Sequence, residues 1–189
     1  MSPMSSTTGS ASRTVAIALL ACSSILMAGC ASPRQPPDKD GEPYCFRVGR
    51  GHKRATCTQG AVPGRAVESE AKQFVARPDV LTLYIVRSRW RDLVYRVAVS
   101  IDDGQPIQTV PNSFVRIRLS PGEHQVVLQW KDVRQVIIVR GATGSIAFLE
   151  LAGSTGLFHT EYGWANVSDV DAKRKITAAH LIADLDSPT

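Results

Sequence analysis

Short apolar runs separated by turn residues fill the middle of this sequence, and they constrain its fold more than any other feature. Seven such runs follow one another in residues 80–151, bounded by Gly, Pro, Asn or Asp. Most of them alternate apolar and polar side chains, as strands do when they bury one face. This pattern predicts a mainly β domain: an antiparallel β-sandwich of about seven or eight short strands, immunoglobulin-like or transthyretin-like.

The first of these runs differs from the others because it is apolar on both faces. Residues 80–88 carry large apolar side chains at odd and even positions alike. Such a pattern predicts a central strand. Residues 158–164 predict an additional strand at a sheet edge. The other expected strands cover residues 94–101, 105–110, 114–119, 123–130, 133–140 and 145–151.

Two short helices are expected, one on each side of the strand region. Residues 67–76 have apolar side chains on one side and end before Pro78, which cannot continue a helix. A second helix begins at Ser168, a favourable N-cap residue that is followed by acidic side chains in the first turn. We therefore place the β domain at residues 67–183 and expect a frayed tail at residues 184–189.

Residues 1–29 have the features of a bacterial signal peptide. Arg13 precedes an apolar run, residues 15–28, that contains no charged residue, Pro or Gly. Its 14 residues are too few to cross a bilayer, which takes about 20, but they suit the apolar core of a signal peptide. The alternatives are a buried apolar helix and an ordinary secretory signal with a chance cysteine.

The end of this run, Leu-Met-Ala-Gly-Cys at residues 26–30, resembles a bacterial lipobox. Met27 stands where leucine is common in that motif. The resemblance implies cleavage before Cys30 and attachment of acyl chains such as palmitate to its sulfur. Because Ala31 rather than Asp follows, it also implies sorting to the outer membrane, facing the periplasm. Residues 30–43 contain four prolines and are expected to form an extended tether.

Cys45 and Cys57 are the cysteines that remain once Cys22 leaves with the signal peptide and the anchor uses Cys30. An even pair in an oxidising compartment predicts a disulfide. The closed loop has 13 residues. In the chain-entropy model, a loop of this length stabilises the fold by about 3 kcal/mol.

Residues 44–66, which we term the basic cysteine loop, carry five basic residues and no acid. Two interpretations remain open. The loop is either a solvated surface segment that the disulfide stabilises, or a contact site for anionic headgroups, lipopolysaccharide or an acidic partner. Cys45, His52 and Cys57 as metal ligands would match no zinc spacing, so neither a metal nor a cofactor is expected.

A second candidate surface follows the first strand. Arg87, Arg89 and Arg91 flank Trp90 within five residues. Tryptophan and arginine are common contact residues at binding sites. We expect this loop to recognise an anionic glycan, a lipid headgroup or an envelope protein. Alternatively, Trp90 packs at the end of the sandwich while the arginines pair with acids such as Asp92.

Catalytic chemistry has little support in the sequence. The four histidines are scattered, and none lies in an H-E-x-x-H motif or near a G-x-S-x-G elbow. We therefore expect that the protein is not an enzyme. A hydrolase ranks third, after the interaction domain and the ligand carrier described below. His124 follows a tight turn and is expected to be a hydrogen-bonded structural residue. Glu150 alternates with apolar side chains, so it is either a solvated acid or a buried partner of an arginine.

Two short motifs connect this chain with a known family. Residues 71–87 contain an A-K-x-F segment that leads into a strand ending Y-x-x-R, and residues 113–124 read S-F-x-x-x-x-x-x-P-G-x-H. They resemble a family of small Gram-negative lipoproteins that carry one β-rich domain of unknown function. The likeness covers residues 71–176. It implies the same β domain with no established catalytic residues, and the basic cysteine loop lies outside it.

The charge balance argues against nucleic-acid binding, and two hypotheses for the function remain. The chain has 22 Lys and Arg against 17 Asp and Glu, an excess too small to indicate binding of nucleic acid. The first hypothesis is a membrane-anchored lipoprotein of the cell envelope, whose non-catalytic β domain serves interaction or scaffolding. The alternative is a carrier of a small apolar or lipid ligand in a pocket of the β domain. Strands with two apolar faces favour the first, because they indicate a filled interior.

Overall fold

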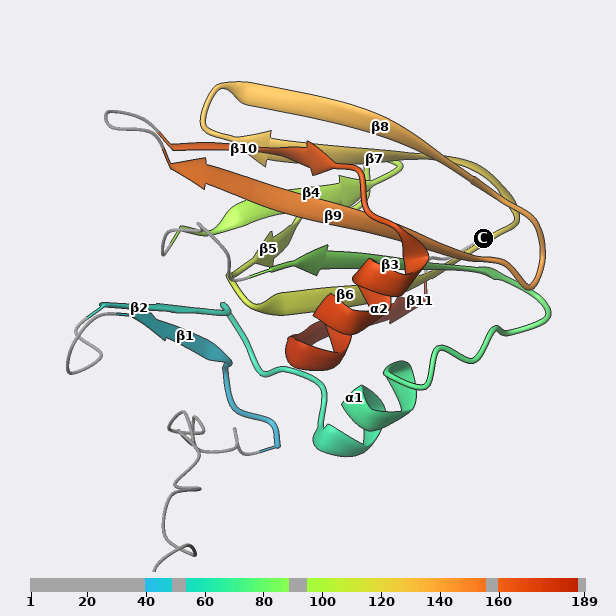
Figure 1. Ribbon diagram of the computed structural model, residues 1–189, viewed down its shortest axis with the longest axis horizontal. Coiled ribbons are helices and arrows are strands. Elements are labelled where there is room, and N and C mark those ends of the chain that lie inside the picture. Colours follow the sequence, from blue (N-terminus) through green and yellow to red (C-terminus); the bar gives the residue numbers. More distant parts are fainter. Residues whose placement is uncertain (1–39, 49–53, 89–94, 156–159, 187–189) are drawn as a thin grey trace, which may run out of the picture. The chain divides into compact units, whose positions relative to one another are not determined.

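The computed structural model describes residues 40–48, 54–88, 95–155 and 160–186. Within these ranges the chain forms 11 strands in three sheets and two helices (Figure 1). The prediction of a mainly β protein is therefore confirmed. The signal peptide, Cys30 and the Pro-rich tether up to residue 39 lie outside the described residues.

Each of the eight strands expected from the sequence is present, with ends that differ by a few residues. The apolar alternation within each run and the turn residues between runs account for this agreement. The strands are β3 (Leu81–Arg87), β4 (Val97–Ile101), β5 (Ile107–Thr109), β6 (Ser113–Leu119), β7 (Gly122–Trp130), β8 (Val133–Gly141), β9 (Ile146–Thr155) and β10 (Thr160–Ala165).

The two larger sheets combine antiparallel and parallel pairings. One has the order β10-β9-β3-β6-β11, with β11 at His180–Asp186, and the other has the order β5-β4-β7-β8. As predicted, β3 is central and β10 lies at an edge. However, β3 pairs with β9 and β6 with β11 in parallel, so the prediction of an entirely antiparallel sandwich of seven or eight strands is wrong. An immunoglobulin-like or transthyretin-like order does not describe these sheets.

The C-terminal strand β11 corrects the expectation of a frayed tail. Residues 180–186 form β11, which pairs with β6, and of the expected tail residues 187–189 lie outside the described part of the chain. Asp184 pairs with Arg116 in register, and Asp186 pairs with Arg118. These alternating opposite charges stabilise a strand whose end is too polar to be recognised from hydrophobicity.

The main hydrophobic core lies between the two larger sheets. Inward-facing side chains of the five-stranded sheet and of the four-stranded sheet contact each other there. Because successive residues of a strand point to opposite faces, every second residue of β3 enters this core. Its central members are Leu81, Leu83, Ile85, Val97, Val99, Val115, Ile117, Val126 and Leu128.

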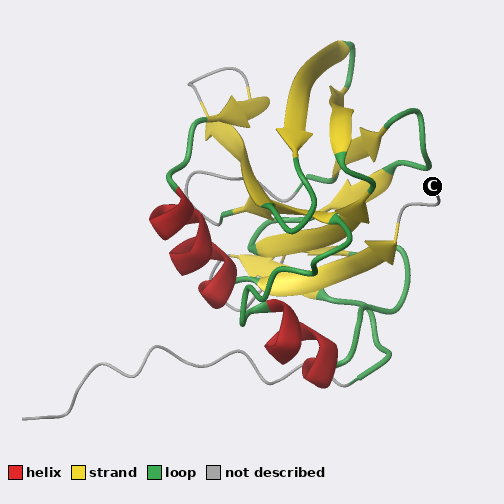
Figure 2. Cartoon of the chain, turned by 90° about the vertical axis from the view of Figure 1, so that its right-hand side faces the viewer, coloured by secondary structure: helices red, strands yellow, loops and turns green. Residues whose placement is uncertain are grey.

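Both helices contribute to a second core on the other face of the five-stranded sheet (Figure 2). Helix α2 (Asp169–Ala178) begins at the predicted cap, since the Ser168 hydroxyl accepts a hydrogen bond from the Asp171 N–H. Helix α1 (Arg65–Ala71) is shorter than expected. Phe74 adopts a positive φ of 54°, so the helix ends before it rather than at Pro78. Neither of these described helices has the length and apolarity needed to span a bilayer.

The basic cysteine loop contains a hairpin that belongs to the main core. Strands β1 (Cys45–Val48) and β2 (Arg54–Cys57) pair in antiparallel fashion. Tyr44 and Phe46 are buried among the core residues of both sheets. The ring of Tyr44 also stacks on His180 at the start of β11, with 4.6 Å between ring centroids. The first and last described strands thus meet on the same core.

Candidate functional site

An open cleft lies between two hairpins, the β7–β8 turn and the β9–β10 pair. Its volume is about 550 Å³, which falls in the range of small-ligand and peptide-side-chain sites. In Figure 1, β10 runs beside the β7–β8 hairpin. We call this site the aromatic cleft; the lining residues used below are Trp130, Lys131, Asp132, Ser154, Thr160 and Tyr162.

Two aromatic side chains build one wall of the aromatic cleft. Trp130 ends β7 and is partly exposed, and its ring meets the edge of the Tyr162 ring with 4.8 Å between centroids. Tyr95 contacts the same indole at 5.1 Å. The Lys131 ammonium lies 5.3 Å from the centre of the Trp130 ring. A partly exposed, laterally supported indole is a favourable contact surface, because it is rigid and offers both an apolar face and an N–H donor.

Described residues on either side of the predicted recognition loop contact aromatic side chains of the aromatic cleft. Residues 89–94 lie outside the described residues, and this range includes Arg89, Trp90 and Arg91. The described residues just before and just after this segment contact the two aromatic residues of the cleft wall. Before it, the Arg87 guanidinium lies 4.8 Å from the Tyr162 ring centre. After it, Tyr95 contacts Trp130.

Arg87 itself is not the exposed binding residue that the sequence indicated. It is the last residue of β3 and is 1% exposed. Its guanidinium donates to the Thr109 carbonyl at 2.8 Å. The prediction is wrong for this residue because Arg87 continues the inward-facing alternation of β3. Its role is to support Tyr162 from within the core.

A glutamine side chain joins the two sheets beside the aromatic cleft. The Gln135 amide donates to the Tyr162 carbonyl at 3.4 Å and accepts from the Trp164 N–H at 3.3 Å. Gly163 lies between these two residues, and a Cβ there would lie only 3.1 Å from the Gln135 oxygen. Glycine at this position therefore permits the close approach of β8 to β10.

The polar groups of the aromatic cleft include opposite charges and hydroxyl groups. Lys131 and Asp132 provide opposite charges, and Ser154 and Thr160 provide hydroxyl groups. Among the described residues that line the cleft there is no histidine or cysteine. The described lining thus offers hydrogen-bond donors and acceptors around an aromatic surface.

Sequence reasoning did not assign the aromatic cleft. Trp130 belongs to the expected strand at residues 123–130 and Tyr162 to the expected edge strand at residues 158–164, and neither was assigned a role. A usable signal was the Trp130-Lys131-Asp132 sequence, in which a large aromatic residue stands immediately before a charged turn. That pattern identifies an indole at the end of a sheet, but not the second hairpin opposite it.

The predicted disulfide between Cys45 and Cys57 is present and joins β1 to β2. It uses both sulfurs, which rules out the alternative of Cys45 and Cys57 as metal ligands with His52. His52 lies in residues 49–53, outside the described residues. In the described part of this hairpin, Arg47 and Arg54 are exposed. The Arg96 guanidinium donates to the Cys57 carbonyl at 2.9 Å.

Glu150, whose environment the sequence left open, is buried at 5% exposure. Its carboxylate accepts a hydrogen bond from the Ser88 hydroxyl at 3.0 Å and pairs with the Lys175 ammonium at 2.6 Å. Its partner is therefore a lysine of α2 rather than an arginine. This pair ties the helix to the middle of β9, which is a structural role.

A second group of charges, which we call the arginine clamp, joins β6, β11 and α1. Arg116 is 4% exposed and donates two hydrogen bonds of 2.8 Å to the Asp184 carboxylate. The same guanidinium lies 2.6 Å from a Glu70 carboxylate oxygen. Arg118 pairs with Asp184 and Asp186. The arginine clamp comprises these five side chains.

The clamp shifts the pKa values of its acids. Burial opposes ionisation of Asp184, but the hydrogen bonds and charges of Arg116 and Arg118 outweigh this effect and lower its pKa. The hydrogen bond from Arg116 is the main cause that lowers the pKa of Glu70. Both carboxylates are therefore ionised at neutral pH and hold the guanidinium in place.

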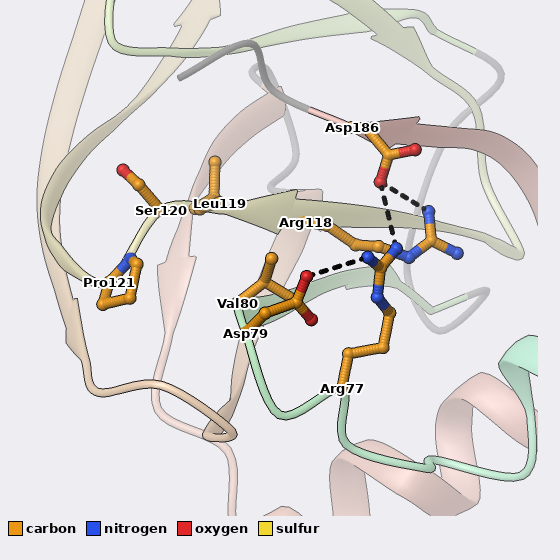
Figure 3. A pocket seen from close by; sticks show the side chains of 8 residues that line it. All are labelled: Arg77, Asp79, Val80, Arg118, Leu119, Ser120, Pro121 and Asp186. Carbon is orange, nitrogen blue, oxygen red and sulfur yellow. Dashed lines mark hydrogen bonds and ion pairs between the residues drawn. The ribbon is translucent and has the colours of Figure 1, made fainter.

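A smaller pocket of about 290 Å³ adjoins the arginine clamp (Figure 3). Its two arginines already have carboxylate partners. Arg77 lies 3.1 Å from Asp79, and Arg118 lies 3.2 Å from Asp186, as the dashed lines in Figure 3 mark. Because the charges compensate each other within this pocket, it has little to offer a charged ligand.

His124 has the structural role expected from the sequence. One ring nitrogen bonds the Asp102 carboxylate and the other bonds the Ser120 carbonyl. Burial disfavours the charged imidazolium, but the hydrogen bond with Asp102 and that with Ser120 outweigh burial and raise the pKa of His124. Both ring nitrogens thus form hydrogen bonds, and these bonds join two turns.

Two comparisons with known proteins, one with family models and one with curated proteins, found no relative of this chain. No protein-family model matches it, and no curated protein matches it either. The resemblance of residues 71–176 to a lipoprotein family accordingly remains a prediction from the sequence motifs.

Proposed function

We propose that this chain is a lipid-anchored, non-catalytic interaction domain of the bacterial cell envelope, and that it binds its partner in the aromatic cleft. The lipobox-like residues 26–30 support the anchor at Cys30 and a position at the outer membrane facing the periplasm. The observation that carries the binding role is the supported indole of Trp130 within a cleft of about 550 Å³.

The alternative of a lipid carrier has less support. A carrier of an apolar molecule needs an apolar cavity between its sheets. Here, side chains from both sheets contact each other in that space. The aromatic cleft opens to solvent, and charged side chains such as Lys131 and Asp132 line it. These features favour a partner that presents polar as well as apolar groups.

The anchor is tested by replacing Cys30 with serine in a Gram-negative host. The variant should lose labelling by radioactive palmitate, because acylation needs the thiol. Cys22→Ser is the matched control, since Cys22 lies in the same apolar run but not at the cleavage position. A Cys30→Ser protein that stays labelled in the membrane fraction would exclude the lipid anchor.

Binding in the aromatic cleft is tested with two variants of the protein lacking residues 1–30. Trp130→Ala removes the indole, and Ser154→Trp fills the cleft without removing a core contact. Each should weaken binding to isolated cell envelopes by about 30-fold, as expected for loss of a central aromatic contact.

The matched control is Val170→Ala, because Val170 is an exposed apolar residue of α2. It should bind as the wild type does, and thermal unfolding should show that all three variants are folded. Unchanged binding of Ser154→Trp would refute a role of the cleft.

A further inference from the structure

The buried ring of His124 faces a hydrogen-bond acceptor at each of its two nitrogens. Its Nδ1 lies 2.5 Å from the Asp102 carboxylate, and its Nε2 lies 2.8 Å from the Ser120 carbonyl oxygen. A neutral imidazole has one donor and one acceptor nitrogen, whereas the imidazolium has two donors. Because a carbonyl oxygen cannot donate, Nε2 carries a hydrogen. If Nδ1 also donates, to the carboxylate, the ring is positively charged.

The surroundings of Asp102 decide where the second proton resides. Its side chain is 43% exposed, so water reaches it, and its other oxygen accepts a hydrogen bond from the Gln125 N–H at 2.8 Å. Both features favour an ionised carboxylate over a protonated one. The proton between the two side chains therefore belongs to the ring, and the contact is an ion pair of imidazolium and carboxylate.

This ion pair joins two connections between strands. Asp102 and Asp103 form the turn that follows β4, and both have a positive φ, 47° and 60°, which is uncommon for residues other than glycine. Ser120 lies between β6 and β7, where the chain passes from the five-stranded to the four-stranded sheet. Ser120 and Pro121 also line the smaller pocket in Figure 3.

The elements around the ring carry other charges, most of which have partners of their own. Glu123 precedes the ring on β7 and pairs with Arg140 of β8 on the opposite face of these strands, since successive side chains alternate. On β6, Arg118 pairs with acids of the arginine clamp. Asp103 is exposed to solvent. The Asp102 carboxylate is the charge that acts on the ring.

The geometry points to a pH-sensitive latch, in which the imidazolium of His124 holds the turn after β4 against the β6–β7 connection and releases that turn when Nδ1 loses its proton. Without this proton, a lone pair of Nδ1 faces the carboxylate, so the attraction between ring and turn becomes repulsion. The latch is separate from the proposed function, because it involves neither the anchor nor the aromatic cleft.

The direction of the pH dependence follows from the pKa of His124. Burial favours the neutral ring, but the hydrogen bonds with Asp102 and Ser120 outweigh burial and raise the pKa above 6.5. A group whose pKa is raised by folding contributes its full stability below the pKa of the unfolded state. This contribution is lost as the pH rises through the raised value. The latch is thus closed in mildly acidic solution and opens as the pH rises.

The charge state is measured on the protein lacking residues 1–30, which keeps every described residue. Long-range proton–nitrogen NMR spectra distinguish the imidazolium from either neutral tautomer. At about pH 6 we expect both nitrogens of His124 to be protonated. The titration midpoint of the ring should lie above 6.5.

Asp102→Asn removes the charge and keeps the turn. Asparagine also tolerates a positive φ, its oxygen can accept from the Gln125 N–H, and its amide can donate to a neutral Nδ1. The midpoint of His124 should therefore fall by at least about one pH unit, as expected for loss of an adjacent opposite charge. The matched control is Asp103→Asn, at the exposed neighbour that also has a positive φ. It should move the midpoint by less than about 0.3 units, because solvent screens this charge.

Opening of the latch is measured at the Gln125 amide, which donates to Asp102. Its protection factor, which corrects for the intrinsic pH dependence of hydrogen exchange, should fall across the titration of His124. The expected fall is about tenfold for each unit by which the pKa is raised, because one unit is a tenfold change in an equilibrium constant. In Asp102→Asn the protection factor should no longer fall over this pH range.

Three results would overturn the latch. They are a wild-type midpoint of His124 at or below 6.5, a midpoint that Asp102→Asn leaves unchanged, and a wild-type protection factor at Gln125 that is constant across the titration. The first and the third are measured on the wild type, so they do not depend on folding of a variant.

Discussion

Replacing Arg116 with methionine should lower the free energy of unfolding by about 3 kcal/mol, which corresponds to a fall in melting temperature of about 10 °C for a domain of this size. The guanidinium is buried and bonds two carboxylates, Asp184 and Glu70. Its removal leaves Asp184, a largely buried charge, with Arg118 as its remaining partner in the arginine clamp. Urea unfolding followed by circular dichroism measures the change.

Arg140→Met provides a matched control. Arg140 also forms an ion pair, with 2.7 Å between its Nε and the Glu123 carboxylate, but both side chains are exposed. A solvated pair of this kind contributes less than about 1 kcal/mol. Equal losses for Arg116→Met and Arg140→Met would show that the clamp has no special role in stability.

The effect of Arg116→Met should depend on pH in a defined direction. The pKa values of Asp184 and Glu70 are lowered from 3.8 and 4.5, so these groups stabilise the fold above those values. Their contribution is lost as the pH falls through the lowered values of the folded state. The difference between wild type and variant should therefore be full at pH 7 and should shrink below about pH 4.

The second large effect is expected at the disulfide. Replacing Cys45 and Cys57 together with serine should lower the free energy of unfolding by about 3 kcal/mol, because the crosslink restricts the unfolded chain. The hairpin it closes also places Tyr44 and Phe46 in the main core. Urea unfolding of the protein lacking residues 1–30 measures the loss.

Reduction of the wild-type protein is the control for this pair. Treatment with dithiothreitol should give the same unfolding midpoint as the double serine variant, since both remove the same bond. An oxidised wild type that unfolds at the same urea concentration as the double variant would show that the crosslink does not stabilise the domain.

The strands that the sequence predicted are those that local pattern determines. Strands β3 to β10 follow from apolar alternation between turn residues, and α2 follows from the cap at Ser168. Strand β11 was missed because its partner, β6, lies 68 residues earlier at the Arg116–Asp184 contact. The usable signal was charge rather than hydrophobicity: basic residues at 116 and 118 match acids at 184 and 186.

The candidate site was less accessible to sequence reasoning than the fold. Arg87 was grouped with the surface loop after the first strand because it flanks Trp90, although its odd position continues the inward face of Leu81, Leu83 and Ile85. The aromatic cleft arises from two hairpins, β7–β8 and β9–β10, that no local pattern brings together. Non-local pairing of this kind depends on the packing of both sheets.

The stacking of Tyr44 on His180 has a consequence for biogenesis. One ring stands at the start of the folded region and the other on its final strand, so the contact spans nearly the whole folded chain. Nucleation of such a topology is slow, because distant segments must meet before they gain from pairing. The polypeptide therefore cannot complete this contact until β11 has been synthesised.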